Sequence, residues 1–252
     1  MSLNILLSIL FLDLVWCKVQ LIHELPSYFP QCYRNDPDLN QCLLKATESV
    51  RPYMKQGIPE LRIPSFEPFS VPEIVLEQGT QSLNFKAVLK NVVIHGITNY
   101  HFTRFDFDVP NLQFFCDADI DNLELDGDYT VHGKVLVAPI EGKGRFTVHV
   151  DHCSIKLIQT YHEVEKDNDI YLLPLKSNTS ITVSGPRTKL DGLFDENSNL
   201  GEVTNKAIND NIDELFSELK PVIEQTISKI MEDVLLKSLM GRVPYNKLYP
   251  FK

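Results

Sequence analysis

Asp117, Asp119 and Asp121 alternate along the chain in the spacing that begins a calcium-binding loop. A loop of that kind needs glycine at its sixth position and a bidentate glutamate at its twelfth, where this chain has Asn122 and Asp128. A solvated acidic face of a strand explains these carboxylates better. We therefore expect no calcium site here.

His149, His152 and Cys153 are the other candidates for metal ligands. In a regular strand the two histidines would point to opposite faces, and the spacing of zinc-finger ligands is missing. No Gly-x-Ser-x-Gly sequence occurs, which disfavours a secreted serine hydrolase acting on a lipophilic hormone. We predict a protein that is not an enzyme, with no catalytic residues, no metal and no cofactor.

The formal net charge of the chain is −10, with 24 basic and 34 acidic residues. An acidic surface repels phosphate groups, so nucleic acid and anionic membranes are poor partners. An endotoxin-binding protein would need a basic tip, and the sequence has no Lys/Arg cluster to form one. We expect no nucleic-acid partner and no integral membrane association, and we expect the protein to be a monomer.

The N-terminal residues 3–16 are almost entirely apolar but too few to span a membrane. We interpret residues 1–17 as a signal peptide, with Val15 and Cys17 at the −3 and −1 positions and cleavage before Lys18. The alternative is a buried N-terminal helix. Because no later run is long and apolar enough for a membrane helix, we expect a secreted protein with residues 18–252 as one domain.

Four cysteines remain after cleavage of the signal peptide. Cys32 and Cys42 flank a turn, and an extracellular location favours a disulfide between them. Cys116 and Cys153 either pair with each other or are two small buried residues, and the sequence leaves both alternatives open. Asn178-Thr179-Ser180 is a sequence for N-glycosylation of Asn178.

The first structured region, about residues 32–70, is predicted to contain a helix. Asp36 is placed to cap it, Pro37 to occupy its first turn, and Gly57 and Pro59 to end it. Its apolar stripe is Leu39, Leu43, Ala46, Val50 and Tyr53. The proline-rich residues 63–69 then predict an extended connection held by its aromatic side chains.

Residues 73–190 alternate between apolar and polar side chains, which predicts antiparallel strands with one apolar face. Two of these strands, at 119–138 and 143–162, are long, and we expect a turn at residues 142–144 between them. The apolar phase changes after Val150, so we predict a bulge near Asp151 and His152 that bends the sheet.

The third region, about Leu200 to Met240, has apolar residues at three- and four-residue steps over a broad stripe. This spacing predicts one long helix, kinked once at Pro221 and ended by Gly241 and Pro244. A coiled coil is the alternative, but the spacing lacks a regular heptad.

These features in this order resemble the takeout and juvenile hormone-binding protein family of secreted insect carriers. The resemblance rests on Cys32 and Cys42 around Asn35-Asp36-Pro37, on Gly57-Ile58-Pro59-Glu60, on the proline-rich link, on residues 129–139 with Gly142-Lys143-Gly144, and on Val243-Pro244-Tyr245. It implies an α+β fold in which a highly curved antiparallel sheet wraps a long C-terminal helix, with a short N-terminal helix, around an apolar tunnel. It also implies the Cys32–Cys42 disulfide.

The resemblance further implies a non-enzymatic carrier of an elongated hydrophobic ligand, such as a lipid, a fatty-acid-like molecule or a terpenoid. No cysteine follows Cys153 to join the C-terminal helix to the sheet, so the takeout branch fits better than the alternative, a juvenile hormone carrier proper. Tyr129, Tyr161 and Tyr171 are candidates to orient a polar end of the ligand, unless they are ordinary core residues. The expected tunnel residues are Leu83, Phe85, Leu89, Phe105, Phe107, Leu125, Tyr129, Val131, Val135, Phe146, Val148, Tyr161, Leu215, Phe216, Leu219 and Ile223.

Overall fold

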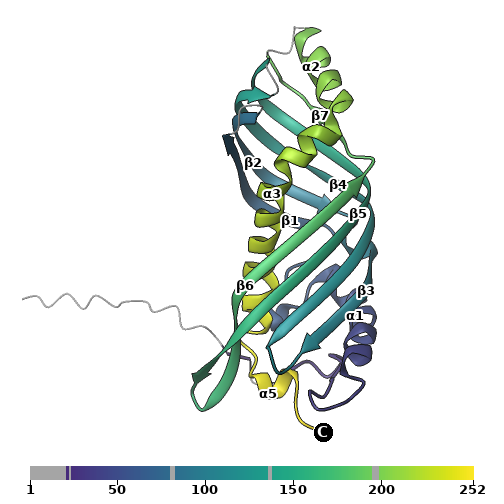
Figure 1. The fold of residues 1–252 in the computed structure, drawn as a ribbon, viewed down its shortest axis with the longest axis vertical. Coiled ribbons are helices and arrows are strands. Elements are labelled where there is room, and N and C mark those ends of the chain that lie inside the picture. The colour runs from purple at the N-terminus through teal and green to yellow at the C-terminus, as the bar shows by residue number, and fades with distance from the viewer. Residues whose placement is uncertain (1–20, 23, 80–82, 136–137, 195–198) are drawn as a thin grey trace, which may run out of the picture.

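The computed structural model describes residues 21–22, 24–79, 83–135, 138–194 and 199–252, and the predicted signal peptide lies outside them. A curved sheet extends along the molecule, with α2 at one end and α5 at the other (Figure 1). The helices are α1 (Leu39–Gln56), α2 (Asn199–Asp210), α3 (Ile212–Met231), α4 (Lys237–Leu239) and α5 (Tyr245–Leu248), with 3-10 turns η1 (Pro59–Leu61) and η2 (Ile97–Asn99) and a π-helical turn η3 (Glu232–Leu236). The strands are β1 (Phe69–Gly79), β2 (Leu83–His95), β3 (Tyr100–Asp108), β4 (Gln113–Val135), β5 (Ala138–Lys166), β6 (Asp169–Ser184) and β7 (Arg187–Leu190).

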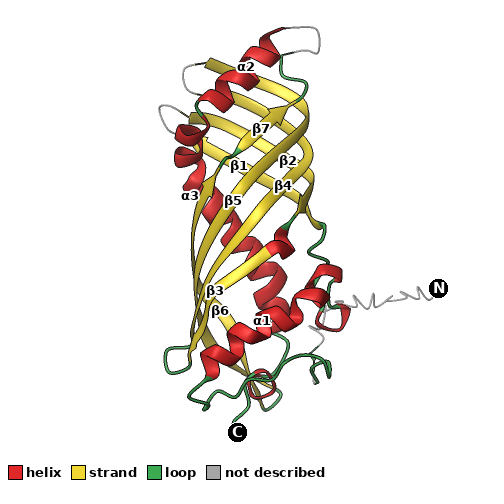
Figure 2. Ribbon diagram, turned by 90° about the vertical axis from the view of Figure 1, so that its right-hand side faces the viewer, coloured by secondary structure: helices red, strands yellow, loops and turns green. Residues whose placement is uncertain are grey.

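All of these strand pairs are antiparallel, as the alternating sequence predicts. The main order is β1-β2-β4-β5-β6, while β3 pairs with part of β4 and β7 with part of β5. β4 and β5 contain 23 and 29 residues, far above the usual five or six. Strands of this length twist strongly, and the sheet curves around α3 (Figure 1 and Figure 2).

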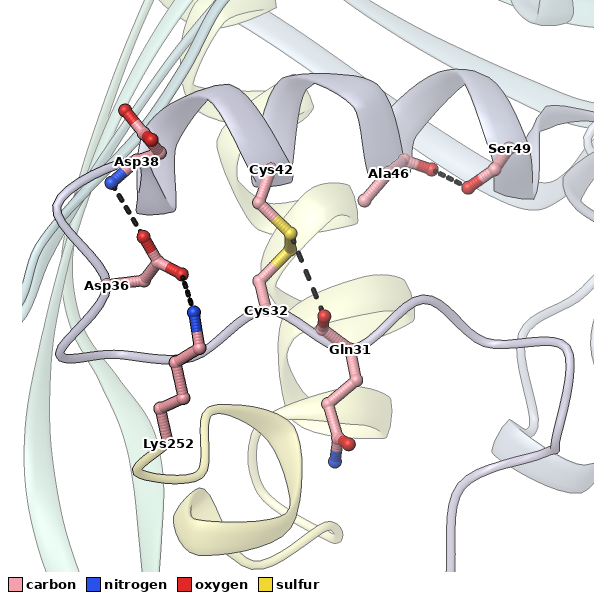
Figure 3. The surroundings of a disulfide bond; sticks show 8 residues. All are labelled: Gln31, Cys32, Asp36, Asp38, Cys42, Ala46, Ser49 and Lys252. Carbon is pink, nitrogen blue, oxygen red and sulfur yellow. Dashed lines mark hydrogen bonds and ion pairs between the residues drawn. A yellow bond between two sulfur atoms is a disulfide. The ribbon is translucent and has the colours of Figure 1, made fainter.

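α1 begins at Leu39, two residues later than predicted, because Asp36 acts in the turn before the helix. Its carboxylate accepts a hydrogen bond from the backbone N–H of Asp38 at 2.9 Å. The Cys32–Cys42 disulfide ties the preceding segment to the first turns of this helix (Figure 3). Phe66 and Phe69 of the proline-rich link are buried in edge-to-face contact, which anchors the entry into β1. These contacts hold the start of β1, the first strand of the sheet, in place.

The change of apolar phase at Asp151 is real, but the predicted one-residue bulge is wrong in form. The pairing of β4 with β5 keeps one register from Asp121 opposite His152 to Leu123 opposite Val150. Both strands change face at the same step, where Asn122 has a φ of 56°. Gly185, between β6 and β7, has a φ of 62° and lies beside the step at which β4 and β5 change face. The sheet is therefore creased across β4 and β5 together, and their pairing has the same register on both sides of the crease.

The predicted turn at residues 142–144 is also wrong, because Gly142 and Gly144 lie inside β5. They face the backbone of the segment that follows β7, which crosses β5 at this point. A Cβ added at Gly144 would lie 2.1 Å from the carbonyl oxygen of Asp191, and Gly142 forms an isolated bridge with Leu193. Here glycine permits the close approach of two backbones.

The C-terminal region forms several helices in place of one rod kinked at Pro221. Pro221 lies within α3, whereas the chain breaks at Asn211, which has φ −118° and ψ 22°. The Asn211 side chain donates to the carbonyl of Ala207 at 2.8 Å, in competition with the helical backbone. None of the described helices is long and apolar enough to cross a membrane.

α2 is held to the sheet mainly by polar contacts. Asn205 and Asn209, one turn apart, each accept from and donate to the backbone of β7, at Leu190 and Thr188 respectively, over 2.7–2.9 Å. These side chains replace a neighbouring strand along that edge, while Leu200 and Val203 remain exposed.

We predict that Gly144→Ala destabilises the protein by about 1–3 kcal/mol, because the new methyl group would collide with the Asp191 backbone. Urea unfolding measures the change. Gly79→Ala is the control, since nothing lies within 4 Å of a Cβ at that position. Equal stability of the two variants would contradict the close approach of residues 191–193 to β5.

Candidate functional site

The concave face of the sheet is apolar because inward positions on neighbouring strands carry large hydrophobic side chains. Phe85 of β2, Tyr129 and Val131 of β4 and Phe146 of β5 are all buried there. Ile140 continues the face along β5. This surface is the wall on which the candidate site is built.

α3 covers this wall from the side that the sheet leaves open. Its principal contacts with the sheet are to β1 and β6, the outer strands of the main sheet order, so it bridges the two edges. Of the residues of α3, all of which the structure describes, only Leu215 is buried. Phe216, Leu219, Ile223 and Ile227 are half-buried although they are apolar. The helix therefore does not interlock fully with the floor of the sheet.

The predicted tunnel residues divide into three groups. The side chains of Leu83 and Val135 lie outside those that the structure describes. Phe216 and Ile223 are half-buried on α3. The remaining twelve belong to the apolar core or pack against it: Phe85, Leu89, Phe105, Phe107, Leu125, Tyr129, Val131, Phe146, Val148, Tyr161, Leu215 and Leu219.

One end of the interior is filled by an aromatic cluster of Phe107, Phe114, Tyr161, Tyr245 and Tyr249. The rings of Phe107 and Phe114 stack with their centroids 4.2 Å apart, and the ring centroid of Tyr249 lies 5.2 Å from that of Phe107. Burial raises the pKa of Tyr161 well above its usual value. Phe107 and Tyr161, predicted as tunnel walls, therefore lie in this cluster.

The sequence analysis missed the contribution of the C-terminus to this end. Tyr245, Leu248 and Tyr249 are buried although only a few residues follow them. The signal was available, since apolar residues recur after the predicted stop at Gly241 and Pro244. Of these residues, only Tyr245 belongs to the pattern that resembles the family, and the sequence pattern assigns no role to Leu248 or Tyr249.

The three tyrosines proposed to orient a ligand differ in their partners. The hydroxyl of Tyr129 donates to the carbonyl of Asp191 at 2.9 Å and so fixes the segment after β7. Tyr161 belongs to the aromatic cluster. The buried hydroxyl of Tyr171 has no hydrogen-bond partner among the described residues.

Polar side chains join α3 to the edge strand β6. Thr179 Oγ1 lies 2.6 Å from Ser228 Oγ, and the Glu224 carboxylate accepts from the backbone N–H of Ile181 at 2.9 Å. The β6 side of the interior is thus more polar than the floor of the sheet.

Cys116 and Cys153 are free thiols, which decides between the two alternatives that the sequence left open. Burial raises the pKa of Cys116 to about 12 and that of Cys153 to about 11. Both thiols are therefore protonated and unreactive at neutral pH.

The predicted acidic face lies on the outside of β4, where His152 contacts two aspartates. Its Nδ1 lies 2.7 Å from Asp121 Oδ1, and its Nε2 lies 3.5 Å from Asp119 Oδ1. His149 also faces outward, beside Asp151, because the crease reverses the alternation. The expectation that the two histidines occupy opposite faces was wrong.

Ser154, His152 and Asp121 follow the order of a serine hydrolase relay, with Ser154 Oγ 3.2 Å from His152 Nε2. The Ser154 hydroxyl, however, donates to Asp119 rather than to the histidine. A serine whose proton is held by a carboxylate is not activated as a nucleophile by His152. Within the described ranges, no three His, Cys, Asp or Glu residues are grouped to hold a metal ion.

Comparisons with known proteins agree on one family. The family model described as haemolymph juvenile hormone binding protein matches residues 7–250. The chain is 26% identical over 246 residues to the circadian clock-controlled protein daywake of Drosophila melanogaster, covering 94% of this chain and 93% of that protein. The Drosophila yakuba protein of the same name is 28% identical over 234 residues, covering 89% and 88%.

A solved structure shares the fold. The crystal structure of Takeout 1 from Epiphyas postvittana superposes with a TM-score of 0.72 and covers 87% of this chain and 99% of its own. The sequence identity is 19%, so this likeness concerns the fold alone.

We predict that the pKa of His152 lies above 6.5 in the folded protein, mainly because of its hydrogen bond to Asp121. Protonation then favours folding: the contribution is complete below the unfolded pKa and is lost as pH rises through the folded pKa. NMR titration of the imidazole protons measures the value.

Asp121→Asn should lower that pKa towards 6.5. Asp117→Asn on the same strand serves as the control, since Asp117 is not among the groups that raise it. An unchanged pKa in Asp121→Asn would contradict the contact.

Proposed function

Because the chain belongs to the haemolymph juvenile hormone binding protein family, we propose that it is a secreted, non-enzymatic carrier of the takeout-like branch. It binds one elongated hydrophobic molecule between α3 and the concave face of the sheet. The ligand is a lipid, a fatty-acid-like molecule or a terpenoid, and the carrier acts as a monomer.

The observation that carries this proposal is the position of α3 over the sheet. The helix reaches the two outer strands, while most of its apolar residues remain only half-buried. Apolar side chains that are incompletely covered on a helix facing an apolar wall favour an apolar ligand between them. A binding site lined by such residues would suit a long, thin molecule.

The energetics favour binding by shape rather than by charge. Each buried methylene contributes about 0.8 kcal/mol, so a chain of fifteen carbons gains roughly 12 kcal/mol before the cost of ordering is subtracted. The aromatic cluster at the α5 end would limit the length of ligand that fits. Selectivity then depends mainly on length and width.

Secretion and glycosylation are part of the same proposal. The Cys32–Cys42 disulfide supports an oxidising location. Asn178 is exposed on β6, where its side chain is accessible to a glycan. Cleavage before Lys18 would remove the apolar N-terminal segment.

We predict that the purified protein binds an apolar fluorescent fatty-acid probe at micromolar concentration or below. Leu219→Trp, which adds a bulky ring to a residue packed against the core, should weaken this binding by about tenfold. Ser217→Trp, at an exposed position on the same helix, is the matched control and should bind as the wild type does.

Native mass spectrometry of the extracted protein provides the second readout, because it detects a lipid that co-purifies with the protein.

A sesquiterpenoid ester added to the protein should be recovered intact, because a carrier releases its ligand whereas a hydrolase cleaves it. The absence of both probe uptake and co-purified lipid would overturn the proposed function.

A further inference from the structure

Gln159 is a polar residue in the otherwise apolar inward series of β5. Its neighbours on the same face, Leu157 and Tyr161, are both buried, and Phe114 lies opposite on β4. Gln159 itself has an exposure of 0%. The sequence analysis gave it no role, although it interrupts the apolar positions that continue from Cys153.

The amide of Gln159 is satisfied on one side only. Its Nε2 donates to the carbonyl of Thr160 at 2.9 Å, which fixes the orientation of the group. Its Oε1 is buried and accepts no hydrogen bond from any described residue. A buried acceptor left without a donor is unfavourable, and native proteins keep few such groups.

Ser177, directly opposite Gln159 on β6, has a buried hydroxyl that is also without a partner in the described part of the chain. Directly opposed residues on one face of a sheet have Cβ atoms roughly 5 Å apart. The two strands therefore place an unpaired acceptor and an unpaired hydroxyl at opposed positions. A single small polar group could contact both.

This pair lies on β5 and β6 beside the contacts that β6 makes with α3. The next inward residue along β6, Thr179, contacts Ser228 of α3 at 2.6 Å. One turn before Ser228, Glu224 places a carboxylate on the same side of the helix. Gln159 and Ser177 thus belong to the wall that the proposed ligand would touch.

We propose that Gln159 and Ser177 recognise a hydroxyl group on the hydrophobic ligand, so that the preferred cargo is a long-chain alcohol. This inference rests on the proposed carrier function. The ligand hydroxyl donates to Gln159 Oε1, and its oxygen accepts from Ser177 Oγ. A methyl ether lacks the proton to donate. A carboxylate also lacks that proton and would bring negative charge to an acceptor oxygen.

The test uses the full-length protein and three competitors that displace the bound probe. Each competitor carries a sixteen-carbon alkyl or acyl chain: hexadecan-1-ol, its methyl ether and hexadecanoate. The wild type should bind the alcohol about tenfold more tightly than the ether, as expected for one buried hydrogen-bonded group. Hexadecanoate should bind more weakly than the alcohol. Probe affinity is recorded in parallel for every variant.

Gln159→Met keeps the size of the side chain and removes the acceptor, so the ratio of alcohol to ether affinity should fall to near one. The ether affinity should be unchanged. Ser177→Ala should reduce the ratio in part and provides an independent test if Gln159→Met fails to fold. Gln113→Met is the matched control, because Gln113 pairs with Thr160 on the outward face and should leave the ratio intact.

The outcomes separate the two proposals. If the probe binds but the wild type does not distinguish alcohol from ether, or if both Gln159→Met and Ser177→Ala keep the full ratio, the hydroxyl site is overturned and the carrier function stands. The second result would mean that Gln159 binds only a buried water. If neither the probe nor any competitor binds, both proposals fall.

Discussion

An apolar face on a long curved sheet has to be covered, and in this protein the cover is a helix that spans from one outer strand to the other. The contacts of α3 with β1 and β6 place the helix across the open side of the sheet, with most of its apolar residues only half-buried. A helix with only Leu215 buried contributes less to stability than a helix packed into the floor would. The same arrangement leaves apolar surface for a ligand.

The curvature that makes this possible is concentrated at a few backbone positions. Asn122 and Gly185 have left-handed conformations close to Asp151, and β4 and β5 keep one register through the crease. Elsewhere the pairing shifts between Lys90 and Val93 of β2, between Phe102 and Arg104 of β3, and between Thr160 and Tyr161 where β5 pairs with β6. Gly144 then lets the segment after β7 cross β5 in close contact.

The two faces of the sheet separate charge from apolar surface. Outward residues such as Asp119, Asp121 and His152 neutralise one another in water, and no described group there suggests chemistry beyond ion pairing. Inside, polar groups such as those of Tyr129 and Thr179 are paired, whereas the buried oxygens of Gln159, Ser177, Tyr171 and Tyr245 have no partner among the described residues. Of these, Gln159 and Ser177 lie directly opposite each other on neighbouring strands, which is why we propose them for ligand recognition.

Local patterns in the sequence determined the order of the elements, the inward face of most strands and the Cys32–Cys42 pair, because alternation, helical spacing and redox location are properties of short segments. The structure decided the rest. The helix breaks not at Pro221 but at Asn211, whose side chain bonds the carbonyl of Ala207, a local competition that periodicity does not encode. The glycines at 142 and 144 are explained only by residues 191–193, and His149 shares a face with His152 because β4 and β5 crease together. These two features depend on partners far away in sequence.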